Sequence, residues 1–184
     1  VGSSTNTVDV SAYGNLEPVT WEFDHLTLDY THEYWALFSS TNTGADLDSY
    51  CGFREGGNSP YAGGAAICGN ASDPWDYIYK TTDMTFDIVF RGEDYLIEQT
   101  VSGGNNRYFK GQTFTPSIGI DPDPGAPSTI DIKDITFFRD SNGWEGPTSD
   151  FYLNIYDGDP VNGSGVIVGS STNTVDVSAY GNLE

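Results

Sequence analysis

Apolar residues alternate with polar residues along most of this chain, and no stretch shows a helical period. Met84, Phe86, Ile88 and Phe90 take every second position, and residues 151–155 repeat the pattern. This period of two is typical of a β-strand with one buried face. Gly, Pro, Asn and Asp separate the strand-like segments, as turns do. We therefore predict an all-β fold: an antiparallel β-sandwich, jelly-roll-like, with about ten short strands.

Two of the predicted strands change phase midway. In residues 21–30 the apolar positions move from odd to even numbers, and in residues 129–138 they move from even to odd. A slip of one residue moves every following side chain to the other face of a sheet. Each strand is therefore predicted to hold a β-bulge or to cross between sheets. His25 lies at the first phase change, where we expect a structural, hydrogen-bonded role.

The two ends of the chain carry the same sequence. Residues 1–17 and 168–184 both read VGSSTNTVDVSAYGNLE, and the offset is 167. We divide the chain into one β-sandwich repeat unit, residues 1–167, and an identical copy, residues 168–184, which is the first strand of a next repeat or a donor strand. The predicted assembly strands carry the apolar residues Val8, Val10, Ala12, Val175, Val177 and Ala179.

The duplication has two explanations. Either the parent protein is a tandem array of near-identical units, or a terminal segment was duplicated by engineering to complete the fold. In both cases one place in the sheet has two strands that fit it, and pairing at a sheet edge is a known mode of recognition. The sequence leaves open which copy occupies the sheet, and whether units join covalently or by strand exchange.

The net charge of the chain limits the classes of molecule that it is expected to bind. Asp and Glu number 27 against 7 Lys and Arg, which gives a formal net charge of −20 in 184 residues. So few cations argue against binding to nucleic acid and to anionic membrane surfaces. Since the chain also lacks the long apolar run of a membrane-spanning helix, we expect no membrane insertion.

The two cysteines bear on the cellular location of the protein. Cys51 and Cys68 both lie within a glycine-rich stretch, residues 44–72, that is predicted to be one long surface loop. A disulfide across it would stabilise the fold by roughly 3 kcal/mol. We predict this disulfide, and with it an extracellular or cell-surface location. The alternative is a pair of unrelated buried thiols.

Acidic residues in turn-like stretches indicate calcium. Closely spaced Asp, Asn and Glu side chains supply several of the six to eight oxygen ligands that Ca²⁺ takes, and a divalent ion would relieve the charge repulsion. The alternative for each stretch is a solvated turn. We expect Ca²⁺ as the cofactor, and the candidate ligands are Asp121, Asp123, Asp140, Asn142, Glu145, Asp157 and Asp159.

Several aromatic residues lie in or near predicted loops. Exposed rings on a sandwich stack on sugar faces, whereas the alternative is that they cap the core. The candidates for sugar stacking are Trp35, Trp75, Trp144, Tyr61 and Tyr77.

Catalytic motifs are absent. The sequence contains no Gly-x-Ser-x-Gly and no P-loop. Glycoside hydrolysis needs only a pair of carboxylates, and the first candidates for that pair would be Glu22, Glu33 and Glu98. We expect that the protein is not an enzyme.

In acidity, strand content, lack of helix and repetition, the chain resembles the tandem β-sandwich modules of extracellular adhesins and stalks. The resemblance implies a structural role in a fibre, stalk or filament, with copies of the chain as partners, terminal strands as the joint and calcium as a stiffener. A second reading is an extracellular carbohydrate-binding module with glycans as partners. A third is a secreted glycosidase.

Overall fold

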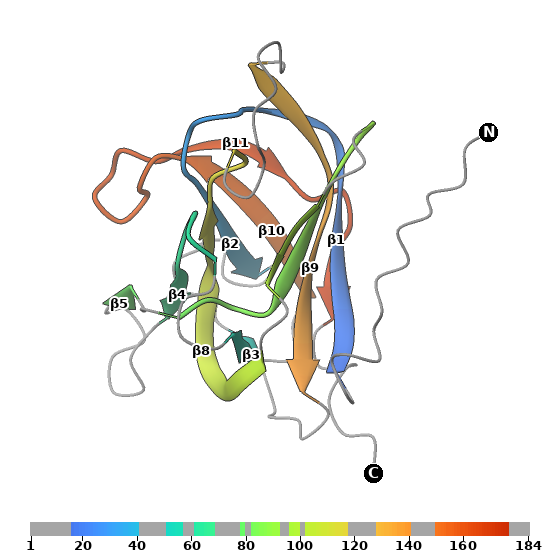
Figure 1. Cartoon of the computed structure of the whole chain (residues 1–184), viewed down its shortest axis with the longest axis vertical. Coiled ribbons are helices and arrows are strands. Elements are labelled where there is room, and N and C mark those ends of the chain that lie inside the picture. Colours follow the sequence, from blue (N-terminus) through green and yellow to red (C-terminus); the bar gives the residue numbers. More distant parts are fainter. Residues whose placement is uncertain are drawn as a thin grey trace, which may run out of the picture.

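The computed structural model describes nine stretches of the chain: residues 16–40, 51–56, 61–68, 78–79, 82–92, 96–99, 102–117, 128–140 and 150–176. They form twelve strands in two antiparallel sheets (Figure 1), which confirms the predicted all-β fold. Within these stretches there is no helix long and apolar enough to cross a membrane.

The first sheet has four strands in the order β1-β9-β6-β7. Their bounds are β1 (Leu16–Asp29), β9 (Thr129–Asp140), β6 (Phe86–Phe90) and β7 (Leu96–Gln99). The long strand β1 therefore lies at an edge, with β9 as its only ladder partner among the described strands.

The second sheet has eight strands in the order β11-β10-β2-β8-β4-β5, with β12 also paired to β10 and β3 to β8. Their bounds are β2 (Tyr34–Ser40), β3 (Cys51–Gly56), β4 (Ala66–Cys68), β5 (Ile78–Tyr79), β8 (Ser102–Phe114), β10 (Asp150–Asp157), β11 (Val166–Ser170) and β12 (Val175–Asp176).

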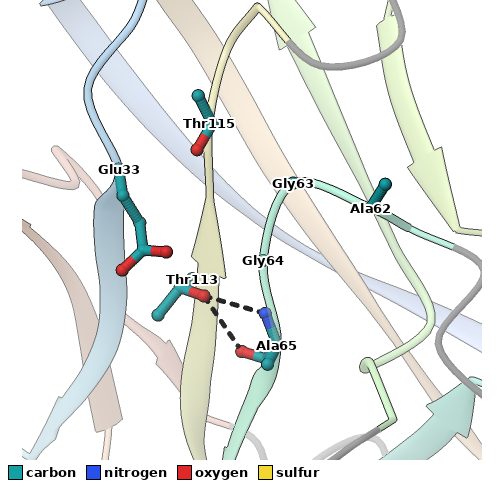
Figure 2. Close-up of a pocket in the computed structure, with 7 residues that line it drawn as sticks. All are labelled: Glu33, Ala62, Gly63, Gly64, Ala65, Thr113 and Thr115. Atoms are coloured by element: carbon teal, nitrogen blue, oxygen red, sulfur yellow. Dashed lines mark hydrogen bonds between the residues drawn. The ribbon is translucent and has the colours of Figure 1, made fainter.

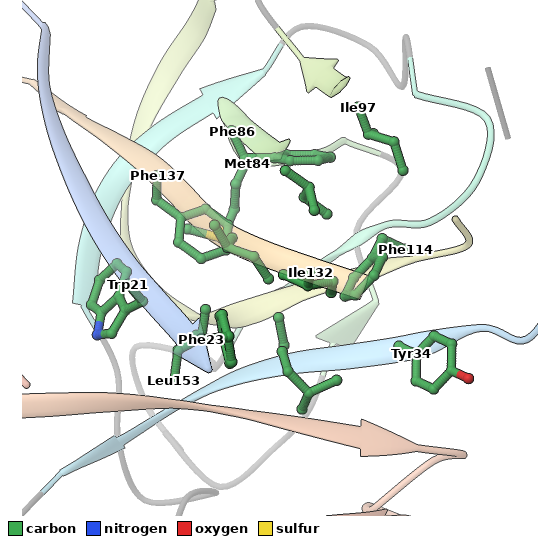
Figure 3. Close-up of a cluster of buried hydrophobic side chains, with 14 of the residues drawn as sticks. Trp21, Phe23, Tyr34, Met84, Phe86, Ile97, Phe114, Ile132, Phe137 and Leu153 are labelled. Carbon is green, nitrogen blue, oxygen red and sulfur yellow. The ribbon is translucent and has the colours of Figure 1, made fainter. Parts of the chain in front are cut away.

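The core lies between the two sheets (Figure 3). Trp21 of β1 is fully buried, and its ring centroid is 5.4 Å from that of Phe38 and 6.0 Å from that of Phe137. Its indole Nε1 donates a hydrogen bond of 2.9 Å to the Phe151 carbonyl of β10. Side chains of both sheets thus pack on one another, which is the packing of a β-sandwich.

Both predicted phase changes are β-bulges, and they lie opposite each other. The register of β1 on β9 passes from Glu22–Asp134 to Leu26–Ile132, so three residues of β1 face one residue of β9. The ladder between β9 and β6 shifts at the same level. His25 lies in the bulge with a φ of 53°, and its Nδ1 is 3.0 Å from an Asp131 carboxylate oxygen. The structural role predicted for His25 is confirmed.

The register of the second sheet does not support the predicted disulfide. Cys51 of β3 and Cys68 of β4 both pair with Phe109 of β8, and Figure 1 shows β3 and β4 on the two sides of β8. Strands on either side of a common neighbour are about 10 Å apart. The Cα atoms of a disulfide are only about 4.4–6.8 Å apart. The disulfide therefore stays a prediction without support from the backbone. The prediction of one long surface loop over residues 44–72 is wrong, because β3 and β4 lie within it and Phe53, Ala66 and Ile67 are buried.

Candidate functional site

The described part of the C-terminal copy, residues 168–176, is built into the sandwich, and we call it the closing segment. It continues β11, which pairs with residues 154–157 of β10, and it ends in β12, which pairs with residues 150–151. The other edge of β10 is taken by β2. The closing segment therefore runs along β10 and forms one edge of the eight-stranded sheet.

Between β11 and β12 the closing segment contacts the edge strand of the other sheet. Thr172 donates its N–H to the Glu22 carbonyl at 2.8 Å. The Asn173 side chain accepts from the N–H of Glu22 at 2.8 Å and donates to the carbonyl of Thr20 at 3.0 Å. Because these backbone groups point away from β9, they have no ladder partner there. The Asn173 amide takes the place that a peptide group of a further strand would have.

Smaller residues fix the position of the closing segment on β10. The Ser171 N–H donates to the Leu153 carbonyl at 2.8 Å, and its hydroxyl accepts from the Leu153 N–H at 3.0 Å. Val175 is buried in the main core. Gly169 lies so close to Leu26 that an added Cβ would come within 2.6 Å of Leu26 Cδ1. The groove between β10 and β1, which we call the closing groove, thus fits a particular sequence.

The outer side of β11 is open. Val166, Ile167 and Val168 are 64%, 50% and 40% exposed. β11 ends the strand order of its sheet, so no described strand covers its outer edge. Three consecutive exposed aliphatic residues on an edge strand are a typical feature of surfaces that pair with another chain.

One of the predicted assembly residues lies in the described part of the chain. Val175 is buried opposite Phe151, as a strand residue facing the core would be, and its role in assembly stays a prediction. The other five predicted assembly residues lie outside the described residues: Val8, Val10, Ala12, Val177 and Ala179. The ladder begins earlier than the copy, at Val166, so the proposed boundary at residue 167 falls inside β11.

Sequence reasoning missed the polar contacts of the closing segment. Thr172 and Asn173 interrupt the alternation of apolar residues, so a search for buried strand positions passes over them. A usable signal was nevertheless present, because the two copies agree at polar positions as strictly as at apolar ones.

The predicted calcium ligands do not converge in the described stretches. Asp157 lies 3.3 Å from His32 Nδ1, and an Asp159 carboxylate oxygen accepts from the Val161 N–H at 2.8 Å, as in a turn. Asp140 ends β9. Among the described residues no three His, Cys, Asp or Glu side chains gather around one point. The remaining candidates, Asp121, Asp123, Asn142 and Glu145, lie outside those residues, so the calcium site stays a prediction.

Two of the predicted sugar-stacking residues are buried, and that prediction is wrong for them. Trp35 is 1% exposed and packs with Leu37 and Ile67. Tyr61 is 6% exposed, and its hydroxyl donates to the Thr115 carbonyl at 3.0 Å. Trp75, Tyr77 and Trp144 lie outside the described residues.

A pocket of about 310 Å³ opens between the start of β2 and the end of β8 (Figure 2). Figure 2 shows Glu33 pointing toward Thr113 from the β2 side. The Thr113 hydroxyl is already used by the backbone, since it accepts from the Ala65 N–H at 2.8 Å. The pocket is lined by Glu33, Ala62, Gly63, Gly64, Ala65, Thr113 and Thr115, none of which is aromatic.

A buried carboxyl group lies next to this region. Asp83 is 0% exposed and accepts hydrogen bonds from the Gln112 amide at 2.9 Å and from the Tyr61 N–H at 3.3 Å. Burial raises the pKa of Asp83 above its usual value, although both hydrogen bonds act in the other direction. Since its partners are an amide and a backbone N–H, the arrangement indicates a structural role.

Comparisons with protein-family models, with curated proteins and with solved structures find no match for this chain. Likeness to a characterised protein therefore assigns neither family nor activity. The feature that distinguishes this chain is the closing groove together with a second copy of the segment that fills it.

Proposed function

We propose that this protein is a structural module of an extracellular tandem-repeat or self-assembling fibre, such as a stalk, adhesin or filament, whose units join through their terminal strands. One observation carries the proposal: the closing segment completes the sandwich, and its sequence recurs at residues 1–9. An identical sequence can make the same contacts in the groove of another unit. Partners in the fibre are then copies of the same chain.

The position of the repeat supports a covalent array. The described strands begin at Leu16 and end at Asp176, and Leu183 corresponds to Leu16 at the repeat offset of 167. A next unit in such an array would start its own β1 at Leu183. Only residues 177–182 would then separate the last described strand of one unit from the first strand of the next.

Further proposals concern the environment of the fibre. An extracellular or cell-surface location rests on acidity and repetition, since the strand register does not support the disulfide. Calcium at the junctions would reduce the repulsion that a net charge of −20 creates. A jelly-roll-like connection of the strands belongs to the same proposal, and we propose no enzymatic activity.

Two shortened chains test the proposed joint. A chain of residues 16–184 keeps the groove and the closing segment but lacks the second copy, so light scattering should find a monomer. A chain of residues 1–165 has an empty groove and one donor, so it should form head-to-tail oligomers that grow with concentration. The proposed joining by strand addition would be refuted if the second chain stayed monomeric, or if the first assembled equally.

A second candidate function is carbohydrate binding, favoured by the pocket beside Glu33. A carboxylate beside threonine and glycine backbone suits a sugar's hydroxyl groups. On a glycan array, the protein should then bind a defined set of sugars, and Glu33→Gln should abolish that binding without lowering the melting temperature. If no glycan on the array is bound, carbohydrate binding is excluded as a candidate function.

A further inference from the structure

Two identical segments of this chain fit one site. Residues 168–176 occupy the closing groove, and residues 1–9 have the same sequence. We propose that the closing groove is an exchangeable peptide-binding site for which the two copies compete, so that residues 1–9 of the same or of a second chain can replace the closing segment. This inference rests on the proposed function for its use between units, but the site itself can be tested separately.

The contacts that hold the closing segment all come from duplicated residues. The buried valine, the glycine against Leu26 and the serine on Leu153 each have a counterpart at the other end of the chain. The pairs are Gly169 with Gly2, Ser171 with Ser4, Thr172 with Thr5, Asn173 with Asn6 and Val175 with Val8. Nothing in the groove can therefore distinguish the copies by sequence.

The path of the chain allows either copy to enter. Thr172 contacts Glu22, and Asn173 reaches back to Thr20, so the closing segment runs antiparallel to β1 and heads toward Leu16. A segment placed in the groove in the same direction would need only residues 10–15 to connect to Leu16. Six extended residues span about 20 Å. Residues 1–9 can thus compete for the groove of their own unit as well as for that of a neighbour.

Asn173 is the residue that tests the competition best. Its amide makes two hydrogen bonds to backbone groups on the edge of β1, where no described strand offers a replacement. Asn6 is the matched control, because it stands in the same sequence context at the other end of the chain. The experiment compares four full-length proteins: the native chain, Asn6→Ala, Asn173→Ala and the double variant.

Exchange predicts that the two substitutions are not additive. Asn6→Ala should leave the melting temperature unchanged, because residues 1–9 are surplus while the closing segment is intact. Asn173→Ala should lower it only slightly, because the unaltered N-terminal copy takes over the groove. The double variant has no unaltered copy, and we expect its melting temperature to fall about 2–8 °C below that of Asn173→Ala. Equal melting temperatures for these last two proteins would overturn the proposal.

A second pair of variants covers the case in which the alanine variants do not fold. Gly169→Val places a side chain against Leu26, Gly2→Val is the matching change in the other copy, and the same cycle of single and double variants applies. A labelled synthetic peptide of residues 1–15 gives a direct measurement. It should bind the Asn6→Ala, Asn173→Ala double variant at least about tenfold more tightly than a peptide carrying Asn6→Ala, given two lost hydrogen bonds. Equal binding of the two peptides would contradict selective recognition.

The mass of the Asn173→Ala protein separates this site from the proposed fibre. If residues 1–9 of a neighbouring chain fill the groove and restore stability, oligomers form, and this result supports both the exchangeable groove and the proposed fibre. Rescue in a monomer supports the exchangeable groove and argues against non-covalent assembly. Absence of rescue overturns the groove proposal and leaves a covalent array with fixed closing segments.

Discussion

Asp83 shows how one buried carboxyl group makes stability depend on pH. Its pKa is raised in the folded protein, chiefly by burial, so the folded state binds the proton more tightly than the unfolded chain. The free energy of unfolding should therefore fall as the pH rises from 3.8, the ordinary pKa of an aspartate, through the raised pKa of Asp83. This contribution opposes that of carboxylates whose pKa values are lowered on folding.

We predict that Asp83→Asn removes this contribution. The two hydrogen bonds reach different oxygens of Asp83, and asparagine has an NH₂ group in place of one of them, so at pH 4 the variant should be less stable than the native protein. At pH 7 the native protein bears the cost of the buried charge, and the difference should shrink or reverse. Urea unfolding at the two pH values measures it. Asp24→Asn is the control for net charge, because Asp24 is exposed, and an equal pH response there would contradict the prediction.

For single residues, the sequence did not reveal which side chains are buried, so roles that depend on exposure were predicted wrongly. Trp35 and Tyr61 were expected in the solvent because turn-forming residues stand near them. Their burial involves contacts with Ile67 and Thr115, which are distant in sequence and carry no local signal. The buried polar network of Asp83 was missed for the same reason, since Gln112 is 29 residues away.

At the level of strands, the sequence predicted more, because a period of two reports directly on which face is buried. Both phase changes were recognised from the apolar positions alone, although the sequence left open whether each was a bulge or a crossing between sheets. What the pattern could not reveal is that the bulges of β1 and β9 face each other, which requires the register of the ladder. The bulge of β1 also requires a positive φ at His25, a backbone conformation that glycine adopts more readily.

His25 therefore provides a test of the bulge with a matched pair of substitutions. His25→Gly and His25→Ala both lose the contact with Asp131, but only alanine keeps the strain of a Cβ at positive φ. We expect the glycine variant to be more stable than the alanine variant by about 1 kcal/mol in chemical denaturation. At Thr27, an exposed position of the same strand, the order should be reversed, with alanine the more stable. Alanine more stable at both positions would contradict the bulge geometry.

For the whole molecule, the excess of acid predicts how ions change stability. A net charge of −20 resists compaction, and simple screening by salt should raise the melting temperature. A calcium site adds a specific effect, so CaCl₂ should raise the melting temperature more than NaCl or MgCl₂ at the same ionic strength, and excess EGTA should reverse it. If the three salts act equally, calcium is no more than a screening ion.

In the proposed array, the closing segment would also determine how units follow one another. The closing segment runs toward the end of the sandwich where β1 begins, so the chain would enter and leave each unit at the same end. In an array, the short link of residues 177–182 would then hold two neighbouring units at those ends. Force applied to such a chain reaches the outer hydrogen bonds of β1 and β12 first and opens them one after another, whereas force along the strands would load many at once.

Single-molecule pulling distinguishes these two directions. With handles at positions 1 and 184, we expect unfolding at a lower force than with handles at positions 1 and 163, because the turn at Gly163 precedes β11 and lies away from the end where β1 begins. Such a module would extend by peeling at low load, and a fibre built from it would be extensible rather than stiff. Equal or higher forces for the first pair of handles would show that the outer strands are locked, in which case the closing segment would be a permanent part of each unit.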